Sequence, residues 1–553
     1  MWIKNIIVGL IICISLPLNA QQNAKEKGLE AITEIAVKGQ LDFLASDWTE
    51  GRETGTKGAY MATDYIASMF QVYGLKPGGD RKTVTPRRGM TREEYEELAS
   101  QKTFFQNFNL LETWPGEEQE LSVVTKNGDA EKSVDFNYRT DFSISGGSNG
   151  MSGTVPVVFI GYGLQDSEKG YDDLEGLDLK GKIVVKIPGY PGHKNPGSAT
   201  HEKFKPAEGE RNNRSSMMSG YGRGSRYSWA AEMGVLAVIS YNPKANPAAQ
   251  WADNDVYYPA ELNGPPRGIR KPMRRLDAEP RGGNSINFTV TDKVIKEIVN
   301  GLELDFDALE DKIDKTGKPA SMDLPGKYIR FKTTMNSRIV KARNVVGIIE
   351  GKKKDECIVL GAHFDHMGMR DGFIFNGSDA NASGTVGIMT IAKAMMASGK
   401  QPEYTMVFCA WTAEEKGLIG SAYFADNPVI EDIKCYMNYD MISRVDPEDP
   451  NKNKCDFKYT NTVPAFKDLT VKHIDQYNYN LDMKYDGSER PVGGSDFSSF
   501  SRKGIPIFLL HGKFTPDYHA YTDHSDKAEI PYMTDIIKVG YLNLFELANN
   551  YKW

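Results

Sequence analysis

The chain is poor in cysteine and has no excess of basic residues. Only 5 of its 553 residues are cysteine, which is too few for a small scaffold held together by disulfides. Their spacings also do not match those of a zinc finger. Lys and Arg number 67 against 74 for Asp and Glu, and the formal net charge is −7. Because binding to a phosphate backbone requires a concentration of positive charge, we expect no nucleic-acid partner.

The few cysteines lie in two kinds of surroundings. Cys357 and Cys409 belong to apolar runs, where a thiol behaves as a small buried hydrophobic group. Cys435 and Cys455 flank a polar segment and could form a disulfide in an oxidising compartment. The sequence leaves this pairing open, because it does not fix the distance between the two residues.

Long uncharged runs are also missing, apart from one short run at the start of the chain. Lys4 precedes an apolar stretch over residues 6–16, and Ala20 supplies a small residue before two glutamines. This pattern is typical of a signal peptide, and the stretch is shorter than the roughly 20 residues that span a bilayer. We therefore predict that residues 1–20 are removed, that the mature chain is exported to the periplasm or beyond, and that it has no stable membrane insertion.

The remaining sequence changes character twice. Apolar residues recur at helical spacing in the amino-terminal part, short β-like runs with nearby glycines follow, and strand and helix patterns alternate in the last part. No period of 20 to 50 residues repeats, which excludes solenoids and propellers. We predict one domain from residues 28–119 and 331–553, with a β-rich module inserted over 120–330.

The carboxyl-terminal part predicts an α/β fold. Four short apolar runs are expected to be strands, and helical patterns follow two of them, at 385–396 and 421–426. Strands this apolar are typical of a parallel sheet that is buried on both faces. We therefore expect a mostly parallel central sheet flanked by helices, with strands at 357–362, 405–411, 435–439 and 505–510.

Polar residues that suit metal ions follow each of these predicted strands. Open α/β sheets bind ligands at the carboxyl ends of their strands, so residues distant in sequence are expected to meet there. Two imidazoles and three carboxylates suit a pair of divalent cations such as Zn²⁺. One carboxylate must bridge two such ions, and we choose Asp379 because it lies in a Gly-rich loop. The predicted metal ligands are His363, Asp379, Glu415, Asp440 and His519.

Two further carboxylates are assigned beside these ligands. Glu414 and Glu415 are adjacent, and neighbouring residues in a loop point in different directions. One can therefore bind metal while the other accepts and donates a proton. We assign the general base to Glu414 and the metal ligand to Glu415. Asp365 lies two positions after His363 and is expected to hold the second ring nitrogen of that imidazole.

These motifs resemble, in the same order, those of the co-catalytic dizinc aminopeptidases related to glutamate carboxypeptidase. The resemblance covers roughly 340–530, and the helical stretch 29–75 resembles that family's amino-terminal segment. Residues 179–184 and 230–239 of the inserted module resemble a protease-associated domain. The matching motifs are His363-Phe364-Asp365-His366, Ser378-Asp379-Ala380-Asn381-Ala382-Ser383-Gly384, Glu414-Glu415-Lys416-Gly417-Leu418-Ile419-Gly420-Ser421, Asn438-Tyr439-Asp440-Met441 and Tyr518-His519.

The resemblance implies an exopeptidase with two Zn²⁺ ions and a peptide substrate. One ion would be held by His363, Asp379 and Asp440, and the other by Asp379, Glu415 and His519. Glu414 would be the general base, and Tyr518 would help to polarise the scissile carbonyl. The remaining histidines near the motifs would be structural or lie at the rim: His366, His511 and His524.

The resemblance favours an aminopeptidase but leaves alternatives. Arg370, Arg444 and Arg502 lie near the motifs, and a carboxypeptidase or dipeptidase needs such a cation for a terminal carboxylate. Glutaminyl cyclases share the fold with a single zinc, and receptor-like relatives keep it as binding modules after losing ligands. The complete ligand set argues against these last two alternatives.

Overall fold

The computed structural model resolves into two compact units, which are described separately. The first contains the described residues up to Leu110 and from Val340 to Trp553, and the second contains those from Leu111 to Ile339. The predicted signal peptide, residues 1–20, lies outside the described part of the chain. The structure describes residues 23–146, 149–205, 230, 232–241, 273–277, 286–370 and 372–553.

The first unit is built on a mostly parallel sheet. Its strands run in the order β19-β18-β20-β17-β13-β16-β12, and the four central strands β20, β17, β13 and β16 are mutually parallel. The edges add antiparallel pairs, β12 with β16 and β18 with β20. All four predicted strands are confirmed. The bounds are β12 (Met322–Ile349), β13 (Lys353–His363), β16 (Tyr404–Trp411), β17 (Asp432–Asp440), β18 (Lys454–Thr460), β19 (Asp482–Ser488) and β20 (Ile507–His511).

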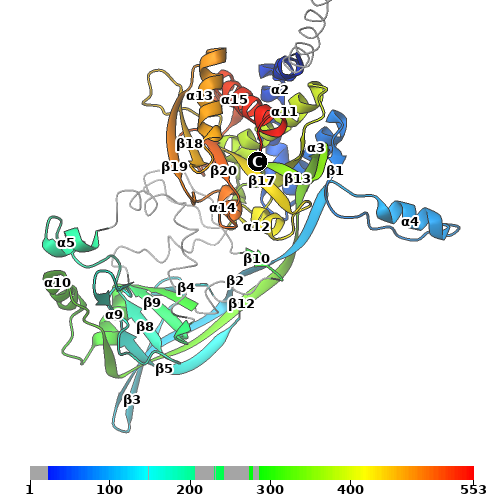
Figure 1. Cartoon of the computed structure of the whole chain (residues 1–553). Helices are drawn as coiled ribbons and strands as arrows, with labels where there is room; N and C mark the ends of the chain where they lie inside the picture. The colour runs from blue at the N-terminus through cyan, green and yellow to red at the C-terminus, as the bar shows by residue number, and fades with distance from the viewer. Residues whose placement is uncertain are drawn as a thin grey trace, which may run out of the picture. The chain divides into compact units, whose positions relative to one another are not determined.

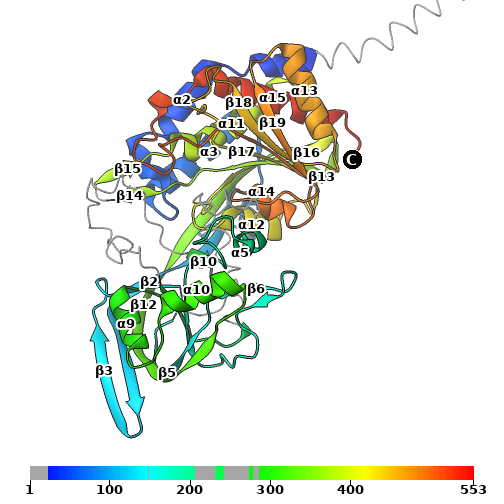
Figure 2. The same cartoon turned by 90° about the vertical axis from the view of Figure 1, so that its left-hand side faces the viewer.

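Helices cover both faces of this sheet, as Figures 1 and 2 show. One face carries the large core cluster, and the opposite face carries a smaller cluster that includes Phe424 and Phe500. The two predicted helices after strands are confirmed as α11 and α12. The first face is covered by α2 (Glu34–Leu44), α3 (Lys57–Tyr73), α11 (Gly384–Ala397), α13 (Ala465–Tyr477) and α15 (Ile530–Asn549), and the second by α12 (Ile419–Asp426) and α14 (Phe497–Ser501).

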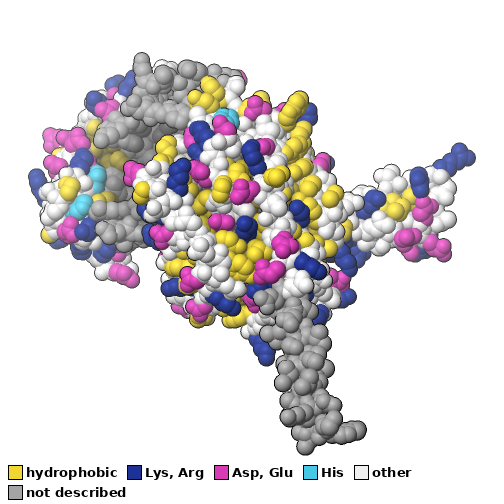
Figure 3. All heavy atoms as spheres, turned by 90° about the horizontal axis from the view of Figure 1, so that it is seen from above, with side chains coloured by type: hydrophobic (Ala, Val, Ile, Leu, Met, Phe, Trp, Pro, Cys, Tyr) yellow, Lys and Arg dark blue, Asp and Glu magenta, His cyan; other side chains and the backbone are white. Residues whose placement is uncertain are grey.

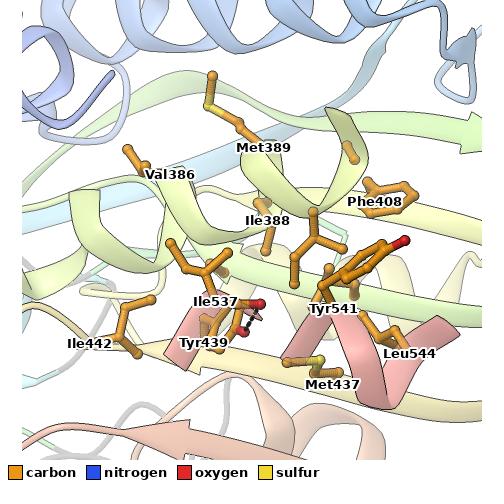
Figure 4. Close-up of a cluster of buried hydrophobic side chains, with 14 of the residues drawn as sticks. Val386, Ile388, Met389, Phe408, Met437, Tyr439, Ile442, Ile537, Tyr541 and Leu544 are labelled. Carbon is orange, nitrogen blue, oxygen red and sulfur yellow. Dashed lines mark hydrogen bonds between the residues drawn. The ribbon is translucent and has the colours of Figure 1, made fainter. Parts of the chain in front are cut away.

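The centre of the large core lies where α11 and α15 pack on the sheet. Figure 4 shows Val386 and Ile388 of α11, Met437 and Tyr439 of β17 and Ile537 of α15 among the side chains of this cluster. All five side chains are fully buried, and burying each large aliphatic side chain stabilises the fold by about 1.5–3 kcal/mol. The Tyr439 hydroxyl donates to the main-chain oxygen of Ile536 at 2.9 Å, so its polar end is satisfied inside the core.

The amino-terminal helices are tied to the loops that follow the strands. Thr56 caps α3 by accepting a hydrogen bond from Ala59, and Gly74 ends this helix with φ of 89°, which glycine adopts without strain. Between α2 and α3 lies the turn η1 (Asp47–Arg52). The guanidinium of Arg52 is fully buried and donates to the main-chain oxygens of Leu44, Phe364, Asn376 and Gly377. This arginine therefore fixes two loops of the sheet edge against the first helices.

Short elements complete the first unit. Residues 92–100 form the helix α4, which has no buried residue and pairs Arg92 with Glu96 on its surface. Figure 3 shows Lys and Arg interspersed with Asp and Glu over the face of the molecule that it presents. The short elements are β1 (Lys76–Pro77), α4 (Arg92–Ser100), β14 (Gly368–Arg370), β15 (Phe373–Phe375), η3 (Ser378–Ser383) and η4 (Ser525–Lys527).

The second unit has a hydrophobic core of its own, and the amino-terminal half of β12 pairs there with β5. Strands β5, β8, β9 and β11 pair in parallel and β4 pairs antiparallel with β11, while α9 and α10 contribute buried side chains to the core. Likeness to a protease-associated domain stays a prediction. The bounds are β2 (Phe105–Asn127), β3 (Ala130–Phe136), β4 (Phe142–Gly146), β5 (Met151–Phe159), β6 (Gln165–Asp166), β7 (Tyr171–Asp172), β8 (Ile183–Lys186), α5 (Ala199–Phe204), β9 (Ala237–Tyr241), β10 (Met273–Arg275), β11 (Ile286–Val290), α9 (Asp292–Val299) and α10 (Phe306–Thr316).

The cysteines after residue 20 are all buried and all carry free thiols. Cys435 and Cys455 therefore do not form the disulfide that the sequence left open, and the thiol of Cys455 donates instead to the main-chain oxygen of His511. Cys357 and Cys409 are buried in an apolar cluster, as predicted. Among the helices that the structure describes, none combines the length and the apolar character needed to cross a membrane.

Candidate active site

The predicted site residues lie at the carboxyl edge of the parallel sheet. His363 is the last residue of β13, Asp440 is the last residue of β17, and the Glu414–Glu415 pair follows β16. Parallel strands bring these ends to one edge, which explains why residues from separate motifs meet. The structure buries every predicted metal ligand and the predicted base, with exposures between 2% and 5%.

His363 forms the first half of the site. Its Nε2 atom lies 3.5 Å from Oδ1 of Asp440 and 3.8 Å from Oε2 of Glu414. Its Nδ1 atom lies 3.1 Å from the main-chain oxygen of Asp365, so this ring nitrogen donates and Nε2 is left to face the two carboxylates. The arrangement leaves Nε2 available as a ligand atom.

Asp365 acts differently from the prediction. Its carboxylate lies 3.8 Å from Nδ1 of His363, beyond hydrogen-bond distance, whereas its main-chain oxygen is in contact. The carboxylate accepts instead from the main-chain N–H groups of Glu414 at 3.0 Å and Glu415 at 3.3 Å, and from the Thr54 hydroxyl at 3.1 Å. Asp365 therefore fixes the loop that carries the glutamate pair, and it orients His363 only through its backbone.

Glu415 and His519 form the second half of the site. Oε1 of Glu415 lies 3.0 Å from Nε2 of His519 and 3.1 Å from Nδ1 of His366. The three side chains have ligand atoms that all lie within 4.8 Å of one another, which is a geometry able to hold a metal ion. The adjacent glutamates thus face different partners, as predicted from their place in a loop.

His366 was not predicted to belong to the site. The sequence predicted a structural or rim position for it, but the structure buries it completely beside Glu415. The available signal was its place three residues after His363, in the loop that leaves the same strand. That spacing alone does not show which way the side chain turns, so only the folded loop reveals the contact.

Asp379 has one carboxylate oxygen held by hydrogen bonds and one without a partner among the described residues. Its Oδ1 atom accepts from the Ser443 N–H at 2.9 Å and the Ser443 hydroxyl at 2.8 Å. Its Oδ2 atom is buried and has no hydrogen-bond partner among the described residues. Asp523 accepts from the N–H groups of Asp379 and Ala380, which holds the loop in place. A buried oxygen of this kind is costly unless a cation or a donor meets it.

The pKa values of these groups reflect burial and crowding of negative charge. Burial raises the pKa of Asp379 to about 6 and that of Glu414 well above its usual range. Burial would lower the pKa of His363, but the charges of Glu414 and Asp440 outweigh it and the pKa is raised. Burial also acts to raise the pKa of Asp440, which is nevertheless lowered by its contact with His363. So many buried carboxylates fit a site built for divalent cations.

Other side chains orient the predicted ligands. The Ser495 hydroxyl donates to Oδ2 of Asp440 at 2.6 Å, and no sequence signal singled this serine out. The ring of Tyr518 stacks on His519 with centroids 3.7 Å apart. His511 lies 2.6 Å from the main-chain oxygen of Gly512, and its structural or rim role stays a prediction.

The carboxyl-terminal part of the chain matches a known peptidase family. Residues 344–539 match the model of peptidase family M28. Leucine aminopeptidase 2 of Trichophyton rubrum is 30% identical over 172 residues, which cover 30% of this chain and 32% of that protein. The glutamate carboxypeptidase 2 homolog of Caenorhabditis elegans is 25% identical over 330 residues, covering 53% of this chain and 38% of that protein. The chain thus spans about a third of the length of these curated relatives.

A solved structure shares the fold over nearly the whole chain. The aminopeptidase from Aneurinibacillus sp. strain AM-1 aligns with a TM-score of 0.56 and 16% identity, covering 96% of this chain and 97% of that one. At this identity the likeness concerns the fold alone. The family match, in contrast, spans every predicted site residue from His363 to His519. Residues 344–539 of this chain, with the whole candidate site, therefore match the model of peptidase family M28.

Proposed function

We propose that this protein is a zinc-dependent exopeptidase that removes residues from the amino terminus of peptides. The observation that carries the proposal is the presence of two buried imidazole–carboxylate pairs, His363 with Asp440 and His519 with Glu415, within a segment that matches the M28 family model. The relative named leucine aminopeptidase 2 supports cleavage at the amino terminus. Export of the chain, which the first twenty residues predict, is part of the same proposal.

The residues present fit two Zn²⁺ ions. His363, Asp379 and Asp440 would hold one ion, and Asp379, Glu415 and His519 the other, since Zn²⁺ accepts imidazole and carboxylate ligands together. The open Oδ2 atom of Asp379 supports its role as the shared ligand. When bound, such a pair of ions lowers the pKa of a water molecule and polarises the scissile carbonyl.

Glu414 is the residue that would move protons. It lies next to His363 rather than in the group formed by Glu415, His519 and His366, so it is placed apart from the second ligand set. Burial raises the pKa of its carboxyl group, which suits a base that takes a proton from water and then gives it to the departing amine. Tyr518, which stacks on His519, would help to polarise the scissile carbonyl of the substrate.

Blocked and free substrates test the proposed function. The purified chain should hydrolyse leucyl p-nitroanilide and lose this activity after dialysis against a chelator, with recovery on adding Zn²⁺. It should not hydrolyse the N-acetylated compound, because an aminopeptidase recognises the free ammonium group. Equal hydrolysis of both compounds would contradict amino-terminal cleavage. Hydrolysis of N-blocked dipeptides only would favour the carboxypeptidase alternative, which the glutamate carboxypeptidase 2 homolog supports.

His366 provides a test that does not depend on activity. Because His366 contacts Glu415, we expect His366→Ala to weaken Zn²⁺ affinity by about 10- to 100-fold, measured by competition with a chromogenic chelator. His366→Asn keeps a hydrogen-bond donor and should recover part of the affinity.

A second buried histidine serves as the matched control. His473 contacts Asn543 in the core at 2.8 Å, and His473→Asn should leave Zn²⁺ affinity unchanged. Unchanged affinity in His366→Ala would show that Glu415 needs no support from this imidazole.

A further inference from the structure

The loop that carries Glu414 and Glu415, residues 412–416, has a backbone conformation that its own residues do not favour. Ala413 has a φ of 56°, in the left-handed region, where the Cβ atom of an L-residue crowds the backbone. Ala413 is fully buried, and the two glutamates are buried beside it. A residue other than glycine stays in this region only where surrounding contacts hold it there. The contacts of this loop therefore decide where the two glutamates point.

Thr54 supplies such contacts from a distant part of the chain. Its hydroxyl oxygen accepts from the N–H of Ala413 at 3.0 Å, and its hydroxyl hydrogen is donated to Oδ2 of Asp365 at 3.1 Å. The hydroxyl of Thr412 lies 3.4 Å from the same oxygen. A hydroxyl group has one donor and two acceptor positions, so all three are used. Thr54 is only 2% exposed, which keeps water away from these contacts.

Thr54 and Asp365 together hold three consecutive N–H groups. The N–H of Ala413 donates to Thr54, and those of Glu414 and Glu415 donate to the carboxylate of Asp365. The hydroxyl of Thr54 also orients this carboxylate by donating to it. One hydroxyl and one carboxylate, in contact with each other, therefore fix the backbone that carries the glutamate pair.

The residue before Thr54 holds the other end of the loop. Oε1 of Glu53 lies 2.8 Å from Nζ of Lys416, the residue that follows Glu415, and this lysine side chain is only 3% exposed. Arg370 pairs with both oxygens of Glu53, at 2.9 and 2.7 Å, and so keeps the carboxylate in place. Residues 53 and 54 thus contact the loop at both of its ends.

We propose that the hydroxyl of Thr54 is a positioning group for the glutamate pair. It holds the strained backbone at Ala413, so that Glu414 stays beside His363 and Glu415 stays beside its two imidazole partners. A displacement of about 1 Å at a reacting group costs roughly 10²-fold in rate, so this contact affects proton transfer as well as metal binding. The inference rests on the proposed peptidase function and adds to it a residue outside the proposed ligands.

Thr54→Val and Thr54→Ser test this role, because valine keeps the shape of threonine without the hydroxyl and serine keeps the hydroxyl. Thr54→Val should lower kcat on leucyl p-nitroanilide by about 10- to 100-fold and change KM much less, since the loop carries the proposed base. It should also weaken Zn²⁺ affinity by about 10-fold, measured without turnover by competition with a chromogenic chelator, because Glu415 is a proposed ligand. Thr54→Ser should keep both values close to those of wild type.

A second substitution in the loop separates positioning from a loss of folded protein. Glycine adopts a φ of 56° without strain, so Ala413→Gly reduces the need for an external contact. The double variant Thr54→Val/Ala413→Gly should therefore have a higher kcat than Thr54→Val alone. All variants are measured well below their Tm, so that kcat reports the position of the loop and not the folded fraction.

The loop keeps other contacts when the hydroxyl of Thr54 is removed. The N–H of Thr412 donates to Oδ1 of Asn344 at 3.1 Å, and Nδ2 of Asn344 donates to the main-chain oxygen of Gly420 at 2.9 Å. Should Thr54→Val not fold, Thr54→Ala removes the hydroxyl without placing a second methyl group against the loop. It should lower kcat and Zn²⁺ affinity in the same way.

A buried threonine of α11 serves as the matched control. Thr390 is fully buried, and its hydroxyl has no hydrogen-bond partner among the described residues. Thr390→Val makes the same chemical change as Thr54→Val and should leave kcat and Zn²⁺ affinity unchanged.

The outcomes separate this inference from the proposed function. Unchanged kcat and Zn²⁺ affinity in a folded Thr54→Val or Thr54→Ala protein would overturn the positioning role, and so would a Thr54→Ser protein as impaired as Thr54→Val. If the zinc-loaded wild type does not hydrolyse leucyl p-nitroanilide, the proposed function itself fails. The Zn²⁺ affinities of the same variants then still decide whether Thr54 positions Glu415.

Discussion

Glu414→Gln should lower kcat by about 10²- to 10⁴-fold while the protein keeps its full metal content. The amide has nearly the same shape as the carboxyl group but accepts no proton, so the attacking water keeps its proton and the leaving amine receives none. The measurement is kcat on leucyl p-nitroanilide together with zinc content by elemental analysis. Metal content should be unchanged because Glu414 is not one of the proposed ligands.

A conservative change at another glutamate controls for this variant. Glu356 lies at the surface, where it pairs with Lys434 at 2.9 Å, and Glu356→Gln should leave kcat unchanged. Near-normal turnover in a zinc-loaded Glu414→Gln protein would remove Glu414 from the proton-transfer role. Loss of zinc in the same variant would instead assign Glu414 to the metal ligands.

Asp379→Asn should abolish detectable activity and reduce the bound zinc below the wild-type amount. A bridging ligand must supply negative charge to two cations, and a neutral amide oxygen does not offset their mutual repulsion. The measurement is zinc per chain after gel filtration. Asp426→Asn, at a surface aspartate that pairs with Lys503, should keep the wild-type zinc content. An unchanged zinc content in Asp379→Asn would exclude Asp379 as the bridge.

In the metal-free protein, Asp379→Asn should increase stability at neutral pH. The folded pKa of Asp379 is about 6, above its usual value of 3.8, because burial disfavours the charged form. Unfolding therefore releases a proton between these values, and the metal-free wild type loses stability as the pH rises from about 4 to 6. The metal-free Asp379→Asn variant lacks this decrease in stability, because an amide does not titrate. It should melt at a higher temperature than metal-free wild type at pH 7, and the difference should shrink at pH 4.

The apolar patterns of the sequence predicted the central sheet. Runs such as 357–362 and 405–411 are mostly apolar. This pattern is typical of a strand that is buried on both faces of a sheet. The order of strand and helix then places the strand ends at one edge, so residues far apart in sequence were predicted to meet there. Cys357 and Cys409 were predicted to be buried for the same reason, since they lie within such runs.

The sequence did not predict the directions in which the loop side chains point. Asp365 was predicted to hold His363 through its carboxylate, but the loop turns that carboxylate toward the N–H groups of the glutamate pair. His366 was predicted to be structural or to lie at the rim, and the same loop buries it against Glu415. Both outcomes depend on backbone angles in a loop, where no hydrophobic period fixes which way a side chain points.

The sequence by itself determined the α/β class, the four central strands and the types of residue that collect at their carboxyl ends. Only the tertiary structure decided the contacts of Ser495 with Asp440 and of Thr54 with Ala413. The physical reason is the range of each interaction. Burial of an apolar face is a local periodic property that a single segment displays, whereas a hydrogen bond between distant segments exists only after the chain has folded.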